Sequence, residues 1–100
     1  MRVYLSGPIT GHEETAPERF SAAEDLFSDF GEEVINPWKI AEAIGAKLTH
    51  EEYMRIDFFL LYLCDAIYLL DGWQDSAGCR REMEEAQRRN MGVFYQDVNA

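Results

Sequence analysis

Basic residues are scarce in this sequence of 100 amino acids. Nine lysines and arginines stand against 19 aspartates and glutamates, which gives a formal net charge of −10 at pH 7. Proteins that bind a nucleic-acid polymer neutralise its phosphates with many lysines and arginines. We therefore expect no nucleic-acid polymer among the partners of this chain. A small anionic ligand is still compatible with the charge, provided that backbone N–H groups and a helix terminus hold it.

Cysteine and histidine are also scarce, with two residues of each type. Cys64 and Cys79 lack the Cys-x-x-Cys spacing that zinc sites commonly use, which argues against a structural zinc site. Free thiols of this kind are typical of the reducing cytoplasm. We expect a cytoplasmic protein that needs no metal ion and no cofactor.

Long apolar segments are missing as well. The longest uninterrupted run, residues 58–64, has seven residues, whereas a membrane-spanning helix needs ~20. Met1-Arg2 leads directly into a strand-like run, without the apolar region and cleavage site of a secretory signal. We therefore expect a soluble protein without a membrane partner. Because so short a chain buries only part of its surface, we also expect it to form a homo-oligomer, a dimer or larger.

Strand-like and helix-like segments alternate along the chain. Strands are expected at residues 2–6, 33–36, 65–71 and 92–95, and helices at residues 16–29, 39–46, 49–63 and 76–89. This alternation predicts a small doubly wound α/β fold, flavodoxin- or Rossmann-like, with about four parallel strands and helices on both faces. At 47% hydrophobic residues, the chain can bury a core, and residues 1–100 are expected to form one domain.

Capping residues mark the expected helix boundaries. Thr15 is expected to cap the first helix, and Ser76 is expected to cap the last. Thr49 and Glu52 form the capping-box pattern at the start of the third helix. The apolar stripe expected on the first helix consists of Phe20, Ala23, Phe27 and Phe30.

Ligands of doubly wound folds bind beyond the carboxyl ends of the strands. Three segments of this chain meet that description, residues 6–11, 36–37 and 71–78. We expect the functional site there. The residues expected to contact a ligand are Ser6, Gly7, Pro8, Thr10, Gly11, Asn36, Ser76 and Gly78.

Two carboxylates do not fit their surroundings. Glu82 has no basic residue three or four positions away and borders the apolar stripe of its helix, while Asp57 lies within Met-Arg-Ile-Asp-Phe-Phe-Leu-Leu. Such an acid either finds a partner elsewhere in the fold or has a raised pKa, and either state suits a proton donor. The structural alternative is a solvated position on a narrow polar strip. Asp71, at the carboxyl end of the third strand, is another candidate; alternatively, it anchors the Gly72 turn.

Three stretches, taken in order, carry a resemblance to a known family. They are residues 3–11 (Val-Tyr-Leu-Ser-Gly-Pro-Ile-Thr-Gly), Asp57 followed seven residues later by Cys64-Asp65-Ala66, and residues 71–86. The chain resembles the nucleoside 2-deoxyribosyltransferase-like superfamily, which includes nucleotide N-glycoside hydrolases.

The resemblance implies a role for each matching residue. Glu82 would attack the anomeric carbon, Asp57 would handle the leaving base, and Tyr4 would steady the nucleophile. Ser76 in Ser-Ala-Gly matches the turn that contacts a 5′-phosphate in the hydrolases. Thr10 stands where those hydrolases often have arginine, so the need for a 5′-phosphate stays open.

The residue types suit the cleavage of an N-glycosidic bond. A nearby carboxylate stabilises the oxocarbenium-like transition state, and an acid in an apolar setting protonates the departing base. We expect an N-glycoside hydrolase or transferase acting on a nucleoside 5′-monophosphate or nucleoside, with Glu82 as nucleophile, Asp57 as acid, and Tyr4 and Asp71 as positioning groups. The alternatives are a nucleotide-binding module without turnover and a purely structural acidic domain.

Overall fold

Four parallel strands organise the structure, a computed structural model that describes residues 1–96. β1 (Arg2–Ser6) pairs with β2 (Glu33–Ile35) on one side and with β3 (Ala66–Leu69) on the other. β4 (Gly92–Tyr95) extends the sheet next to β3, which gives the strand order β2-β1-β3-β4. The order of winding therefore reverses between β1 and β3. In doubly wound sheets, such a reversal opens a crevice at the carboxyl ends of the strands.

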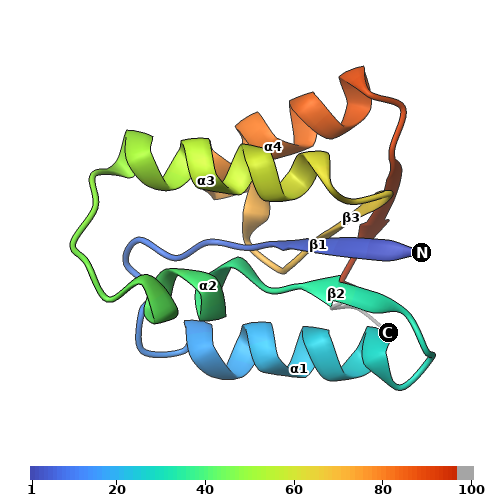
Figure 1. Cartoon of the computed structure of the whole chain (residues 1–100), viewed down its shortest axis with the longest axis horizontal. Coiled ribbons are helices and arrows are strands. Elements are labelled where there is room, and N and C mark those ends of the chain that lie inside the picture. The colour runs from blue at the N-terminus through green and yellow to red at the C-terminus, as the bar shows by residue number, and fades with distance from the viewer. Residues whose placement is uncertain (97–100) are drawn as a thin grey trace.

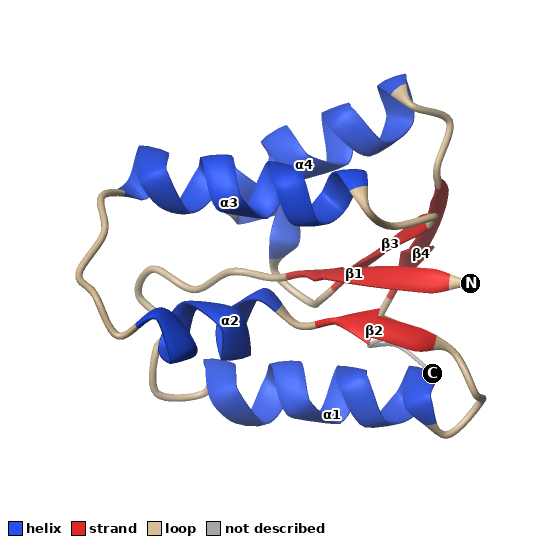
Figure 2. Ribbon diagram, in the orientation of Figure 1, coloured by secondary structure: helices blue, strands red, loops and turns tan. Residues whose placement is uncertain are grey.

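Helices cover both faces of this sheet, as Figures 1 and 2 show. α1 (Ala16–Ser28) lies on one face, and α3 (His50–Tyr62) and α4 (Ala77–Arg88) lie side by side on the other. α2 (Pro37–Ile44) follows the end of β2 and lies between α1 and α3. The predicted Rossmann-like α/β fold is confirmed. In the part of the chain that the structure describes, no helix has the length and apolar character to cross a membrane.

The core consists of two apolar clusters, one on each face of the sheet. Successive residues of a strand point to opposite faces. Val3 and Leu5 therefore join Phe20 in the cluster under α1, while Tyr4 joins Leu61 in the cluster under α3 and α4. All four residues of β3 are buried, as expected for a continuous apolar run. The sheet thus directs the side chain of Tyr4 towards α4.

The boundaries of the helices and strands lie within two residues of the predicted ones. The predicted capping box forms at α3, because Thr49 and Glu52 each accept a hydrogen bond from the backbone N–H of the other. At α4, the side chain of Ser76 accepts a hydrogen bond from the backbone N–H of Cys79. Both helices therefore begin where local sequence signals place them.

Two predictions about α1 were wrong. Thr15 occupies the position before the helix, but its hydroxyl donates to the carbonyl of His12 and caps no N–H group. Phe30 does not extend the buried stripe, because the helix ends at Ser28 and the side chain of Phe30 is 77% exposed.

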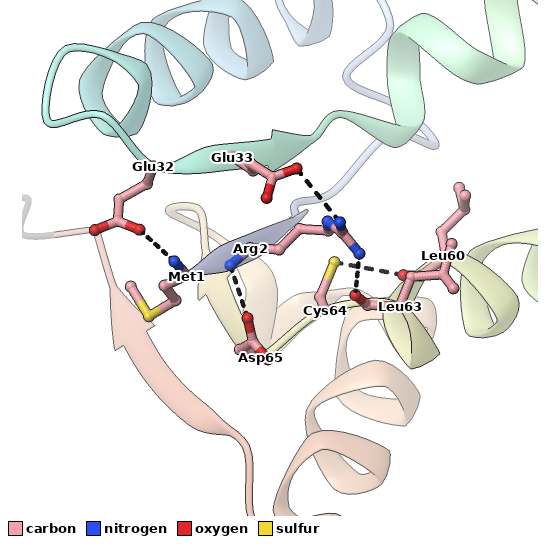
Figure 3. A network of polar contacts seen from close by, with 8 residues as sticks. All are labelled: Met1, Arg2, Glu32, Glu33, Leu60, Leu63, Cys64 and Asp65. Carbon is pink, nitrogen blue, oxygen red and sulfur yellow. Dashed lines mark hydrogen bonds and ion pairs between the residues drawn. The ribbon is translucent and has the colours of Figure 1, made fainter.

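A polar network ties together the amino ends of the strands (Figure 3). The backbone N–H of Arg2 donates to Asp65, and its guanidinium donates to the carbonyl of Leu63 at 2.9 Å and to Glu33 at 3.3 Å. The terminal amino group pairs with Glu32 at 2.9 Å. These contacts hold β1, β2 and the α3–β3 connection together at the end of the sheet opposite the carboxyl ends of the strands.

Candidate active site

Glu82 is a buried carboxylate held by two hydroxyl groups. It lies on the face of α4 that packs against the sheet, and it is 5% exposed. The hydroxyl of Tyr4 donates to Oε2 at 2.5 Å, and the hydroxyl of Ser6 donates to Oε1 at 2.7 Å. Positions 4 and 6 of β1 share one face of the sheet, so the strand presents both donors to α4. Each carboxylate oxygen thus has a donor, which fixes the orientation of the group.

Asp57, on the neighbouring helix α3, lies close enough to Glu82 for their charges to interact. Burial raises the pKa of Asp57 to about 7. Burial, followed by the charge of Asp57, raises the pKa of Glu82 to about 8, although the hydrogen bonds from Tyr4 and Ser6 oppose this rise. Between these two values the pair holds about one proton. An acid and a carboxylate side by side can both give and accept a proton.

A cavity of about 470 Å³ opens beside Asp57, whereas Glu82 is not among its lining residues. Its wall combines the loop after β1, one side of α2, and a face of α3 that includes Asp57. The volume lies within the ~300–1,000 Å³ typical of small-molecule sites. The cavity lies past the carboxyl ends of β1 and β2, in the region where sequence analysis expects a ligand. Its lining residues are Ile9, Thr10, Pro37, Trp38, Ala41, Glu42, Leu48, His50, Tyr53, Met54 and Asp57.

The loop after β1 contributes one of its predicted contact residues to the cavity wall, Thr10. Gly7 instead packs against Leu70, just after β3: a Cβ on Gly7 would lie 3.0 Å from the Cβ of Leu70. Pro8, in the same loop, is buried, and Gly11 is exposed with a φ of +82°. The glycines therefore shape the path of the loop, and Thr10 is the part of it that reaches the cavity.

Asn36 positions a wall of the cavity. Its side-chain oxygen accepts the backbone N–H groups of Trp38 at 3.1 Å and Lys39 at 3.3 Å, and its Nδ2 donates to Glu24 at 3.0 Å. Its polar side-chain atoms are thus engaged in capping α2 and joining it to α1. The structure gives Asn36 a supporting position, behind the residues that line the cavity.

Ser76 and Gly78 begin α4 next to the cavity-lining face of α3. A Cβ on Gly78 would lie 3.3 Å from the Sδ of Met54 and 3.8 Å from the Cε1 of His50. α3 therefore packs directly against the first turn of α4. Met54 and His50 line the cavity, Gly78 packs against them, and neither Ser76 nor Gly78 is among the lining residues.

Asp71 lies apart from the carboxylate pair. It is exposed just after β3, where its backbone carbonyl accepts a hydrogen bond from Arg19 and its backbone N–H donates to Gln96. Among residues 1–96, no hydrogen bond to its carboxylate is found. The structure thus brings Tyr4, Ser6 and Asp57 to Glu82, but it does not bring Asp71 there.

The two cysteines are buried and free. Burial raises the pKa of the Cys64 thiol to about 11, and burial likewise raises the pKa of Cys79. Neither thiol is therefore ionised at neutral pH, as a nucleophile or metal ligand would need to be. Within residues 1–96, no cluster of three or more His, Cys, Asp or Glu side chains is arranged to hold a metal ion.

Sequence reasoning missed most of the α3 wall. His50, Tyr53 and Met54 line the cavity seven, four and three residues before Asp57, which is the spacing of a single helix face. Once Asp57 was suspected, this periodicity could have identified its neighbours. The contributions of α2 depend on how that helix packs against α3, for which the sequence has no comparable signal.

A family model described as a domain of unknown function, DUF4406, matches residues 1–95. The chain belongs to this family. The DUF4406 match includes every residue of the candidate site, from Tyr4 in β1 to Glu82 in α4. It does not in itself place the chain in the nucleoside 2-deoxyribosyltransferase-like superfamily. Among curated proteins, none matches this sequence.

Proposed function

We propose that this DUF4406 protein cleaves the N-glycosidic bond of a nucleoside or nucleoside 5′-monophosphate, as a hydrolase or a transferase. The strongest support is the buried carboxylate of Glu82, which accepts hydrogen bonds from Tyr4 and Ser6 and is paired with Asp57 beside a cavity. Such a pair suits a reaction in which positive charge develops at the anomeric carbon. On this proposal, the chain is a member of the nucleoside 2-deoxyribosyltransferase-like superfamily.

The pair divides the chemistry between its two acids. At neutral pH the pKa values of about 8 for Glu82 and about 7 for Asp57 leave most of the pair's proton on Glu82. The reactive form is the minor one, with the proton on Asp57, in which ionised Glu82 attacks the anomeric carbon and forms an ester bond as the C–N bond breaks. The electron pair of that bond leaves with the base, which takes a proton from Asp57. Water, or a second base in a transferase, then attacks the same carbon and releases Glu82, with Asp57 accepting the proton. The hydroxyl groups of Tyr4 and Ser6 favour the ionised form of Glu82 that the first step requires.

Release of free base tests this proposal. We expect the wild type to release a base from at least one member of a panel of nucleosides and 5′-monophosphates. Replacing the nucleophile in Glu82→Gln should slow release at least about a hundredfold. Glu84→Gln is the matched control, because Glu84 is exposed on the same helix, and it should retain the wild-type rate. The proposal fails if the wild type releases no base, or if Glu82→Gln releases it as fast.

One observation favours a second function, that of a nucleotide-binding module. Glu82 is 5% exposed and lies outside the set of cavity-lining residues, so a ligand can occupy the cavity without touching it. A sensor of this kind would be stabilised by nucleotides, would release no base, and would respond equally in Glu82→Gln. A thermal-shift screen combined with the base-release assay distinguishes the two functions.

We further propose that the protein acts as a homodimer in the cytoplasm. Its free thiols suit a reducing compartment. Large apolar side chains lie exposed on α3, including Phe59 at 64% and Tyr62 at 68%, and would gain from being covered by a second copy. Sedimentation of the wild type should give the dimer mass, and Phe59→Glu should give the monomer. A wild type that sediments as a monomer contradicts the proposed dimer.

A further inference from the structure

Trp38 contacts both the core and the cavity. It is the second residue of α2, and its backbone N–H is bound by the side chain of Asn36 at 3.1 Å, which fixes the start of the helix. Its indole packs against the cluster under α1 and also lines the cavity. The indole ring therefore forms a boundary between the core under α1 and the cavity.

The indole nitrogen of Trp38 is an unpaired donor. Its Nε1 is shielded from solvent, and over residues 1–96 it is the single buried side-chain nitrogen or oxygen without a hydrogen-bond partner. Buried polar atoms in native proteins nearly always have a partner, so an exception needs a cause. The N–H of tryptophan can only donate, which means that the missing partner is an acceptor.

A second aromatic side chain contributes to the wall of the cavity beside Trp38. Tyr53 also lines it, and the hydroxyl of Tyr53 is directed to the carbonyl of Ala46 at 3.5 Å. Of the two carboxylates in the lining, Glu42 and Asp57, neither accepts a hydrogen bond from the indole. The acceptor that pairs this donor would then be supplied by the ligand.

We propose that the indole N–H of Trp38 binds an acceptor atom of a planar base, while the sugar of the same ligand lies towards Asp57 and Glu82. The inference rests on the proposed function for the identity of the ligand as a nucleoside. A carbonyl oxygen or an unprotonated ring nitrogen of the base supplies the acceptor. Because Nε1 is shielded in the free protein, this bond requires the indole to turn so that its N–H opens onto the cavity, where it gains the partner that it lacks. Free ribose has no planar ring to accept it.

Indole NMR signals test this inference directly. The chain has two tryptophans, so a ¹⁵N-labelled sample shows two indole N–H signals, which Trp38→Phe and Trp73→Phe assign. During titration with uridine, cytidine, adenosine, guanosine and ribose, we expect at least one nucleoside to move the Trp38 signal downfield and to slow its exchange with solvent. Ribose should leave that signal in place. Trp73 packs against Tyr95, outside the cavity lining, and its signal serves as the internal control.

The affinity of Trp38→Phe gives the second measurement. It should bind the responding nucleoside roughly tenfold more weakly, the effect of one lost hydrogen bond. A Trp73 signal at its wild-type position shows that this variant is folded. The inference is overturned if Trp38→Phe binds the nucleoside with unchanged affinity, or if the Trp38 signal does not move in a nucleoside-bound sample. It is also overturned if no nucleoside binds.

The two proposals fail in different ways. If the Trp38 signal responds but no base is released, the role of Trp38 in binding the base is supported and the catalytic function is contradicted. If base is released but the Trp38 signal does not move, the catalytic function is supported and the role of Trp38 is contradicted.

Discussion

The hydroxyl groups of Tyr4 and Ser6 act against burial in setting the ionisation of Glu82. Burial and the charge of Asp57 raise its pKa, while the two hydrogen bonds lower it. These bonds stabilise the ionised form, because each hydroxyl donates to a carboxylate oxygen. Removing either donor should therefore shift the ionisation of Glu82 to higher pH.

Tyr4→Phe tests this effect, since it removes the donor and keeps the aromatic ring in the core. We expect kcat/KM at neutral pH to fall about tenfold to a hundredfold, the range for a lost hydrogen bond to a charged group. The acid limb of the pH–rate profile should move to higher pH, because less of Glu82 is ionised at any given pH. Tyr95→Phe, at an exposed position on β4, is the control. A profile that keeps its position in Tyr4→Phe contradicts the assignment.

Glu82 should also make folding stability depend on pH. Its pKa rises from the ordinary value of 4.5 to about 8 on folding, so its stabilising contribution is complete below about pH 4.5 and is lost as the pH rises through 8. Relative to Glu82→Gln, which does not titrate, the wild type should lose roughly 3–5 kcal/mol of unfolding free energy between pH 5 and pH 9. Urea unfolding of both proteins at several pH values measures this difference. A difference that does not change with pH would show that folding leaves the pKa of Glu82 at its ordinary value, which contradicts the setting described for this carboxyl group.

At the scale of the elements, α2 depends on Asn36. Asn36→Ala removes the cap from Trp38 N–H and Lys39 N–H and the bond to Glu24, so it should lower the free energy of unfolding by about 1–2 kcal/mol. It should also weaken ligand binding, because α2 forms one wall of the cavity.

Thr15→Ala is the matched control for that cap. Thr15 precedes α1, but its side chain caps no N–H group, so its loss should change stability by less than about 0.5 kcal/mol. Chemical denaturation of the two variants gives the comparison. Equal losses in both would contradict the role given to Asn36.

Local signals explain why the order of helices and strands could be predicted. Thr49 with Glu52 and the side chain of Ser76 fix helix starts through bonds to residues three positions away, within reach of sequence patterns. Asn90, just after α4, has a φ of +56°, a left-handed conformation of the kind that ends helices. Each of these features depends on neighbours in the chain and needs no knowledge of the fold.

The cavity depends on contacts between distant segments, which limited the prediction of the site. The unusual setting of Glu82 was visible from its helix, but its hydroxyl partners lie more than 70 residues away in β1. Asn36 was expected to contact a ligand, but its side chain caps α2 instead. A polar side chain at the end of a strand suits either a ligand contact or a helix cap, and the sequence does not distinguish the two. The second helix was expected to begin at residue 39, whereas Pro37 already begins it.

At the scale of the whole molecule, charge should select among ligands. The net charge is −10, and the cavity lining contains Glu42 and Asp57 but, among the residues that the structure describes, no lysine or arginine. At low salt we expect a nucleoside to bind about tenfold more tightly than its 5′-monophosphate. This difference in affinity should become smaller as added salt screens the repulsion between the phosphate and the acidic protein. Calorimetric titration of uridine and its monophosphate at two salt concentrations measures this, and tighter binding of the monophosphate at low salt contradicts it.

Covalent capture of the sugar tests the central claim most directly. A 2-deoxy-2-fluoro nucleoside slows turnover, because fluorine disfavours positive charge at the anomeric carbon and so prolongs a glycosyl-enzyme intermediate. Mass spectrometry after incubation should find one fluorosugar per chain, on the peptide that contains Glu82, and none on Glu82→Gln. A protein that releases base from ordinary nucleosides while forming no adduct, or that carries the sugar on another residue, would contradict the account.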